Sequence, residues 1–83
     1  MNYHVYILFS ELKDRFYIGY TSHLEVRLDE HNAGKTPSTK FGRPWKLVYS
    51  EVFQDKSSAS KREMEIKSKE SRKYIASLIK SKG

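Results

Sequence analysis

The stretch FYIGYTSHLEVRLDEH, residues 16–31, places two polar side chains where a helix should be hydrophobic. One face of the predicted helix carries four residues at positions i, i+3, i+4 and i+7: Leu24, Arg27, Leu28 and His31. Arg27 and His31 should therefore lean toward the core, together with the leucines. An arginine can extend its charged end to water from such a face, and a lone histidine is usually structural. Each alone would be ordinary, but the two occur together.

A second helical segment repeats this pattern with a carboxylate. Its inward face carries Ala59, Arg62, Glu63 and Ile66 at the same spacing. A buried, unpaired carboxylate is costly, so Glu63 needs a cation. Two cations fit the sequence: the Arg27 side chain, in a structural ion pair, or a divalent metal at a reaction centre.

Two tyrosines add a third observation. If the first two strands pair so that residue numbers sum to about 23, Tyr6 lies opposite Tyr17 and their hydroxyls share one sheet face. Two tyrosines, an arginine, a histidine and a glutamate would then offer proton acceptors, a phosphate-binding cation and one metal ligand. The reaction class that uses such a set is phosphodiester hydrolysis.

The elements that must position these residues are predicted from periodicity. Residues 2–9, 15–21 and 45–53 have the composition of strands, and apolar residues on both faces of the first favour a central position. A short polar connector makes the first two strands antiparallel. Ser22 and Glu25 have the spacing of a capping box, which predicts a helix from near His23 to a stop at Gly34.

The C-terminal part is predicted to be helical from Lys56 to near the end, capped by Asp55 or Ser57, with a break near 68–71. The order β-β-α-β-α(-α) predicts an α+β fold, a small sandwich in which helices pack on a three-stranded sheet. At 83 residues the chain suits a single domain, residues 1–83.

Charge and composition narrow the class of partner. The net charge is +6, and residues 56–83 contain nine Lys or Arg and three Glu, whereas residues 1–55 contain seven of each sign. This excess is either a solvated helix face or an electrostatic footprint for nucleic acid. The absence of cysteine excludes disulfides and thiolate metal sites. We see no signal peptide and no membrane-spanning run, and we expect a cytoplasmic protein.

Four short motifs, in order, carry a resemblance to a known family. They are HVY at 4–6, YIG at 17–19, RLDEH at 27–31 and RE at 62–63. With this spacing, the chain resembles a GIY-YIG nuclease domain of the small, stand-alone kind. It differs from the family pattern in having His4 where Gly is usual and no Asn among residues 64–83.

The resemblance implies single-metal hydrolysis of a nucleic-acid strand, with DNA as the expected substrate. Tyr6 would be the general base, Tyr17 would support it or orient the phosphate, and Arg27 would stabilise phosphate charge. His31 would assist proton transfer or hold Tyr6, and Glu63 would bind the cation, with Mg²⁺ expected. A tyrosine pKa is normally about 10, and we expect Arg27 and the cation to favour the phenolate.

Basic residues outside this centre are the expected phosphate contacts: Lys40, Arg43, Lys61, Lys67, Lys69 and Lys73. Most family members with known targets carry a second domain, so we expect selectivity for DNA structure rather than for sequence. Two other classes stay open: a non-catalytic nucleic-acid-binding module that retains the fold, and a domain that recruits an acidic protein partner. A separate targeting partner is compatible with each of these classes, and the sequence does not indicate an oligomeric state.

Overall fold

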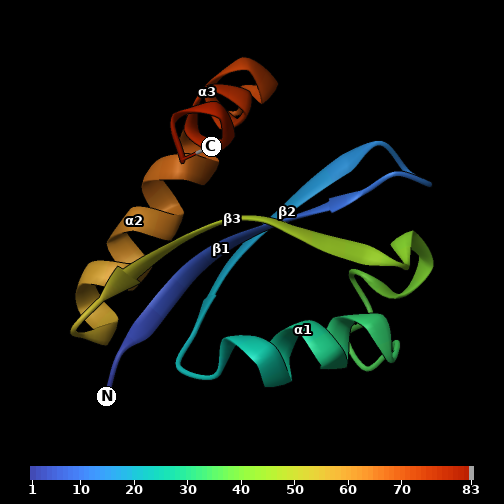
Figure 1. Ribbon diagram of the computed structural model, residues 1–83, viewed down its shortest axis with the longest axis horizontal. Helices are drawn as coiled ribbons and strands as arrows, with labels where there is room; N and C mark the ends of the chain where they lie inside the picture. The colour runs from blue at the N-terminus through green and yellow to red at the C-terminus, as the bar shows by residue number, and fades with distance from the viewer. Residues whose placement is uncertain (83) are drawn as a thin grey trace.

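Three antiparallel strands form the central sheet of the structure, a computed structural model that describes residues 1–82 (Figure 1). The strands are β1 (Tyr3–Ser10), β2 (Arg15–Thr21) and β3 (Trp45–Phe53), in the order β2-β1-β3. The predicted central position of the first strand is therefore confirmed. The predicted domain, residues 1–83, extends one residue beyond the described range.

Helices cover both faces of the sheet. Helix α1 (Leu24–Asn32) lies on one face, and α2 (Lys56–Ser68) and α3 (Arg72–Lys82) lie on the other (Figure 1). A short 3-10 helix, η1 (Lys40–Gly42), precedes β3. The order β-β-α-β-α-α and the break between the last two helices agree with the prediction from sequence. Within residues 1–82, none of the helices combines the length and the apolar character needed to cross a membrane.

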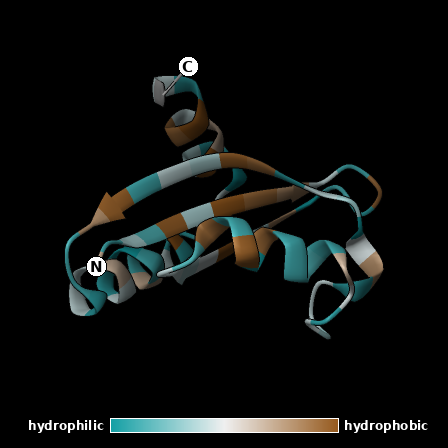
Figure 2. Cartoon of the chain, turned by 60° about the horizontal axis from the view of Figure 1, so that its bottom comes forward, coloured by the Kyte–Doolittle hydropathy of each residue, from teal (hydrophilic) through white to brown (hydrophobic). Residues whose placement is uncertain are grey.

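The alternation of side chains along β1 divides the interior into two hydrophobic clusters. Val5 and Ile7 face α2 and α3, whereas Tyr6 and Leu8 face α1. Trp45 completes the buried cluster on the α1 side. Figure 2 shows hydrophobic residues spread along the strands, with hydrophilic ones between them.

The register of the first hairpin differs from the predicted one. Tyr6 pairs with Gly19, and Tyr17 pairs with Leu8, so the strands are shifted by two residues. A shift of two leaves both tyrosines on the same sheet face, since side chains alternate with period two. A Cβ at position 19 would lie 2.6 Å from the Tyr6 hydroxyl. In this register the end of the Tyr6 side chain therefore lies over a glycine, and a side chain at position 19 would clash with it.

The predicted capping box at the start of α1 is not formed. His23 is the N-cap residue, and Ser22 Oγ instead hydrogen-bonds His23 Nδ1 at 2.8 Å. Ser22 lies one position too early to reach the free N–H groups of the first turn. The predicted cap of the second helix is confirmed, because the Asp55 carboxylate accepts from the Ser58 N–H at 2.8 Å.

A pair of hydrogen bonds joins the end of α1 to the start of β3. The Asn32 side chain accepts from the Trp45 backbone N–H at 2.6 Å and donates to the Trp45 carbonyl at 3.1 Å. These bonds hold the two ends of the intervening segment, residues 33–44, next to each other.

Substituting Asn32 with alanine should lower the free energy of unfolding by about 1–2 kcal/mol, because both of these hydrogen bonds are lost. Urea titration followed by circular dichroism measures the change. Asp29→Ala is the matched control on the same helix, since Asp29 is exposed and its side chain is expected to contribute within about 0.5 kcal/mol. Equal stability of the two variants would contradict a structural role for the Asn32 side chain.

Candidate active site

A buried histidine hydrogen-bonds both a strand and a loop on the α1 side of the sheet. His31 Nε2 lies 3.0 Å from the Tyr6 hydroxyl, and His31 Nδ1 lies 2.8 Å from Thr39 Oγ1. Tyr6, His31 and Thr39 are all buried. The predicted convergence of Tyr6 and His31 is therefore present in the structure, and Thr39 extends it.

The direction of these hydrogen bonds follows from the number of hydrogens available. The Thr39 hydroxyl donates to the Thr36 carbonyl at 3.3 Å, so its oxygen accepts from Nδ1–H of His31. A neutral imidazole carries one hydrogen, which leaves Nε2 as an acceptor. The Tyr6 hydroxyl therefore donates to Nε2, and His31 can accept a proton from Tyr6.

Burial controls the ionisation of both partners. It raises the pKa of Tyr6 to about 12, and although Arg27 lowers that pKa, its effect is the smaller one. Burial also lowers the pKa of His31 below its usual value, and the positive charge of Arg27 acts in the same direction. At neutral pH Tyr6 is thus a protonated donor and His31 a neutral acceptor. The expected phenolate at Tyr6 is not favoured in the protein alone.

Tyr17 lies beside this pair and is only partly buried. Its ring centroid is 4.8 Å from that of His31 and 6.3 Å from that of Tyr6. Trp45 packs against its other side, with centroids 6.3 Å apart. Tyr17 therefore lies at the outer edge of the cluster, where it can reach a bound molecule.

Arg27 also lies at the edge of the cluster. Its charge acts on the hydroxyl of Tyr6, and 35% of its side chain is exposed. Its ion pair is with Glu30 on the same helix, at 3.1 Å. An exposed pair of this kind is weak, so an incoming anion can compete for the guanidinium.

Glu63 has a cation partner other than Arg27. Its carboxylate lies 3.3 Å from Lys67 Nζ, one helical turn along α2. The neighbouring Arg62 binds Glu51 of β3 at 2.9 Å and fastens this helix to the sheet. Glu63 is mostly buried yet close enough for its negative charge to raise the pKa of Tyr6. The structural ion pair between Arg27 and Glu63 that the sequence allowed is therefore not formed. Arg27 instead pairs with Glu30, and Glu63 pairs with Lys67.

The donors present fit a hard cation held by few protein ligands. Within residues 1–82, no group of three or more His, Cys, Asp or Glu side chains is gathered as a metal cage. Mg²⁺ commonly binds through one or two carboxylates and completes its shell with water and phosphate oxygens. Glu63, with a single contact to an exposed lysine, suits that kind of site.

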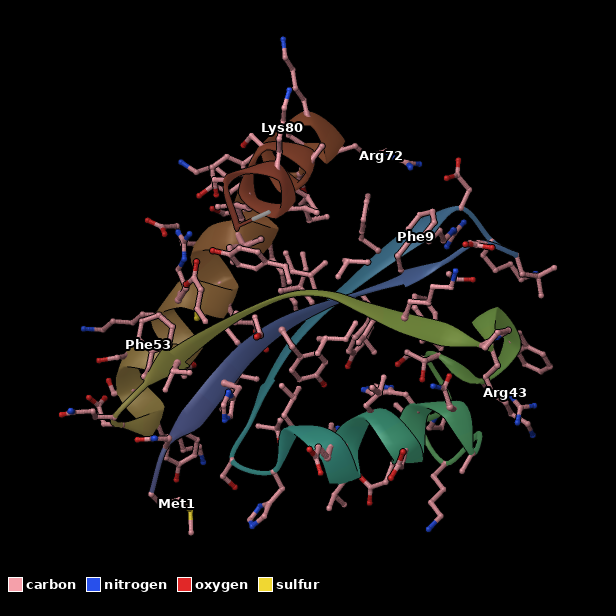
Figure 3. The ribbon with its side chains drawn as sticks, viewed as in Figure 1. Met1, Phe9, Arg43, Phe53, Arg72 and Lys80 are labelled. Atoms are coloured by element: carbon pink, nitrogen blue, oxygen red, sulfur yellow. The ribbon has the colours of Figure 1, made fainter. Side chains whose placement is uncertain are left out.

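The predicted phosphate-binding residues fall into two groups. Lys61, Lys67, Lys69 and Lys73 lie on or between α2 and α3, whereas Lys40 and Arg43 lie at η1. Figure 3 shows Arg43 at the η1 end of the molecule, well away from Arg72 and Lys80 on α3. All six are exposed, and they do not form one continuous surface.

Sequence analysis missed two residues that support the site. Thr39 lies in a loop without periodicity, and only its burial and its contact with His31 distinguish it. Trp45 donates its indole N–H to the Thr39 carbonyl at 2.7 Å and so holds that loop in place. The available signal was Gly42, which indicates close packing at this point of the loop. A Cβ at this position would lie 2.4 Å from the Trp45 ring.

His4, the departure from the family pattern, lies two residues before Tyr6 on the same sheet face. Its Nδ1 is buried and has no hydrogen-bond partner among the described residues. No contact within residues 1–82 explains the choice of histidine at this position.

Comparison with known proteins places these features in a wider group. A family described as the GIY-YIG catalytic domain matches residues 2–75. A UPF0213 protein of Staphylococcus haemolyticus is 48% identical over 64 residues, which is 75% of this chain and 78% of the relative. A UPF0213 protein of Syntrophus aciditrophicus is 46% identical over 80 residues, covering 93% and 88% of the two chains.

A solved structure shares the fold. The solution structure of a UPF0213 protein from Bacillus halodurans aligns with a TM-score of 0.62 and 36% sequence identity. The alignment covers 100% of this chain and 87% of that one. None of these relatives' names states an activity.

Replacing Thr39 with valine should remove the preference of His31 for one tautomer, because the valine methyl group cannot accept a hydrogen bond from Nδ1–H. Nitrogen NMR of the imidazole should show one tautomer in the native protein and a mixture in the valine variant. Stability should fall by about 1–3 kcal/mol, the cost of an unsatisfied buried donor. Thr39→Ser retains the hydroxyl and should retain the native spectrum. Identical imidazole spectra for the valine variant and the native protein would contradict the assigned direction of the hydrogen bonds.

Proposed function

The chain belongs to the GIY-YIG catalytic domain family, a family of nucleases, and from this premise we propose that it is a divalent-metal-dependent endonuclease acting on DNA. The observation that carries the proposal is the buried hydrogen bond between the Tyr6 hydroxyl and His31 Nε2. Hydrophobic packing alone does not require such a bond, and burying its polar groups has a cost. Proton transfer does require it.

Tyr6 acts as a relay rather than as a preformed base. With a pKa of about 12, the phenolate is too scarce at neutral pH to activate water on its own. The hydroxyl oxygen instead takes one proton from the attacking water while its own proton passes to His31 Nε2. Tyr6 ends unchanged, His31 becomes an imidazolium, and that proton leaves to solvent before the next turnover.

The partly exposed groups at the edge of the site bind the phosphate. Arg27 stabilises charge on the phosphoryl oxygens, and the Tyr17 hydroxyl orients them. Glu63 would hold the divalent cation, expected to be Mg²⁺, and that ion would supply Lewis-acid stabilisation of the charge on the phosphate oxygens. These groups contact phosphate and water, and none of them is assigned to a contact with the edge of a DNA base. Selection would therefore follow DNA structure rather than sequence.

A non-catalytic nucleic-acid-binding module is the second candidate, and one observation favours it. Tyr6 has only 2% of its surface exposed, which leaves little access for a water molecule. A cleavage assay on single-stranded, duplex, branched and RNA substrates, with and without Mg²⁺, separates the two candidates. Binding without cleavage on every substrate would establish the second.

Glu63→Gln should remove Mg²⁺-dependent cleavage without unfolding the protein, since the substitution removes the ligand charge and keeps the shape. The lost contact with Lys67 should cost no more than about 1 kcal/mol. Glu65→Gln, two residues along the same helix, is the matched control and should retain cleavage. Wild-type cleavage by a folded Glu63→Gln variant would sink the assignment of Glu63 as the metal ligand.

Tyr6→Phe should lower the cleavage rate by roughly 10²–10⁴-fold, the usual effect of losing a proton-transfer group. Substrate affinity should change little, because the ring and its packing remain. Tyr3→Phe on the same strand is the control, since Tyr3 packs on the opposite face. A loss of affinity as large as the loss of rate would show that Tyr6 binds substrate instead of moving a proton.

A further inference from the structure

An aromatic ring projects from η1 at the end of the molecule where Arg43 also lies. Phe41 is 73% exposed, although Gly42 beside it packs tightly on Trp45. Single exposed hydrophobic residues are common and need no function. The surroundings of Phe41 are what distinguish it.

Phe41 forms a wall shared by two hollows, of about 440 Å³ and 250 Å³. The larger is also lined by Lys40 and Arg43, and the smaller by Lys13 and Arg15. None of the described residues that line either hollow is Asp or Glu. By contrast, the hollow between β2 and the α2–α3 junction includes Asp14 and Glu70.

The nearby carboxylates do not cancel this positive charge. In the turn between β1 and β2, Glu11 is paired with Lys46 at 2.6 Å, and Asp14 is paired with Arg72 at 2.9 Å. Four cationic side chains therefore line the two hollows beside the Phe41 ring, and within residues 1–82 no acidic side chain lines either hollow. Lys40 Nζ lies 5.8 Å from the centroid of Phe41, within the range of a cation–π contact.

We propose that Phe41 is a stacking platform for an unpaired base of a single nucleic-acid strand, whose phosphates lie against the lysines and arginines of the two hollows. The proposal rests on the proposed function, because it assigns a substrate contact to the same protein. Exposed aromatic rings within positively charged grooves bind single strands by stacking, with little dependence on sequence. A duplex keeps its bases stacked on one another, so the ring can reach only an unpaired base.

The platform is continuous with the candidate active site. Trp45 lines the smaller hollow together with Phe41, and its ring centroid is 6.3 Å from that of Tyr17. Thr39, two residues before Phe41, holds His31. A strand stacked on Phe41 therefore lies beside the wall that also supports Tyr17.

The test measures binding of a fluorescent oligothymidylate and of an abasic oligomer with the same phosphates. The native protein should bind the oligothymidylate more tightly. Phe41→Ala should lower that affinity by about tenfold and leave binding of the abasic oligomer unchanged. Phe41→Trp should restore the preference. Lys40→Gln should weaken binding of both oligomers and reduce the salt dependence, with a change of slope of about 0.7 for each lost contact.

Equal affinity of Phe41→Ala and the native protein for oligothymidylate would overturn the platform. Polyglutamate is then added as a competitor. If it displaces the oligothymidylate equally well from the native protein and from Phe41→Ala, the surface fits an acidic protein partner, and the platform is also overturned. Melting curves should be unchanged, since Phe41 is exposed. Failure of the nuclease proposal gives a different result, base-dependent binding without cleavage of any substrate.

Discussion

The two hydrogen bonds of the His31 ring are the constraint on which the α1 side of the structure depends. An imidazole and two hydroxyl groups are buried there, and each would destabilise the protein if left without a partner. Their partners come from β1, α1 and the loop before β3. The His31 ring makes both of its hydrogen bonds only when all three segments dock together. The small cluster of Tyr6, Leu8 and Trp45 therefore gains specificity from polar contacts as well as from hydrophobic packing.

Periodicity was sufficient to predict the strands, the helices and their order, because each buried face leaves a regular pattern. The strand register was not predictable in the same way. A shift by two residues leaves the pattern of faces unchanged, so hydrophobicity could not separate the pairing of Tyr6 with Tyr17 from its pairing with Gly19. The deciding contact, a ring lying over a residue without a Cβ, appears only once the strands are placed side by side.

The site was predictable where residues share an element and less so where loops supply them. Arg27 and His31 followed from one helix face, but Thr39 lies in a loop whose path depends on Trp45 and Asn32. The partner of Glu63 was open because it depends on where α1 and α2 sit across the sheet. Lys67 was nevertheless within reach of sequence reasoning, since residues four apart on a helix are neighbours.

Trp45 is the only tryptophan in the chain, and its position makes it an optical reporter. The indole is buried, its N–H is bonded to the Thr39 carbonyl, and its backbone is bonded to Asn32. Its emission spectrum therefore senses whether the loop is docked and whether α1 is in place. Tyr17 is close enough to transfer excitation energy to it. Ultraviolet fluorescence can thus follow the assembly of this side of the protein without any label.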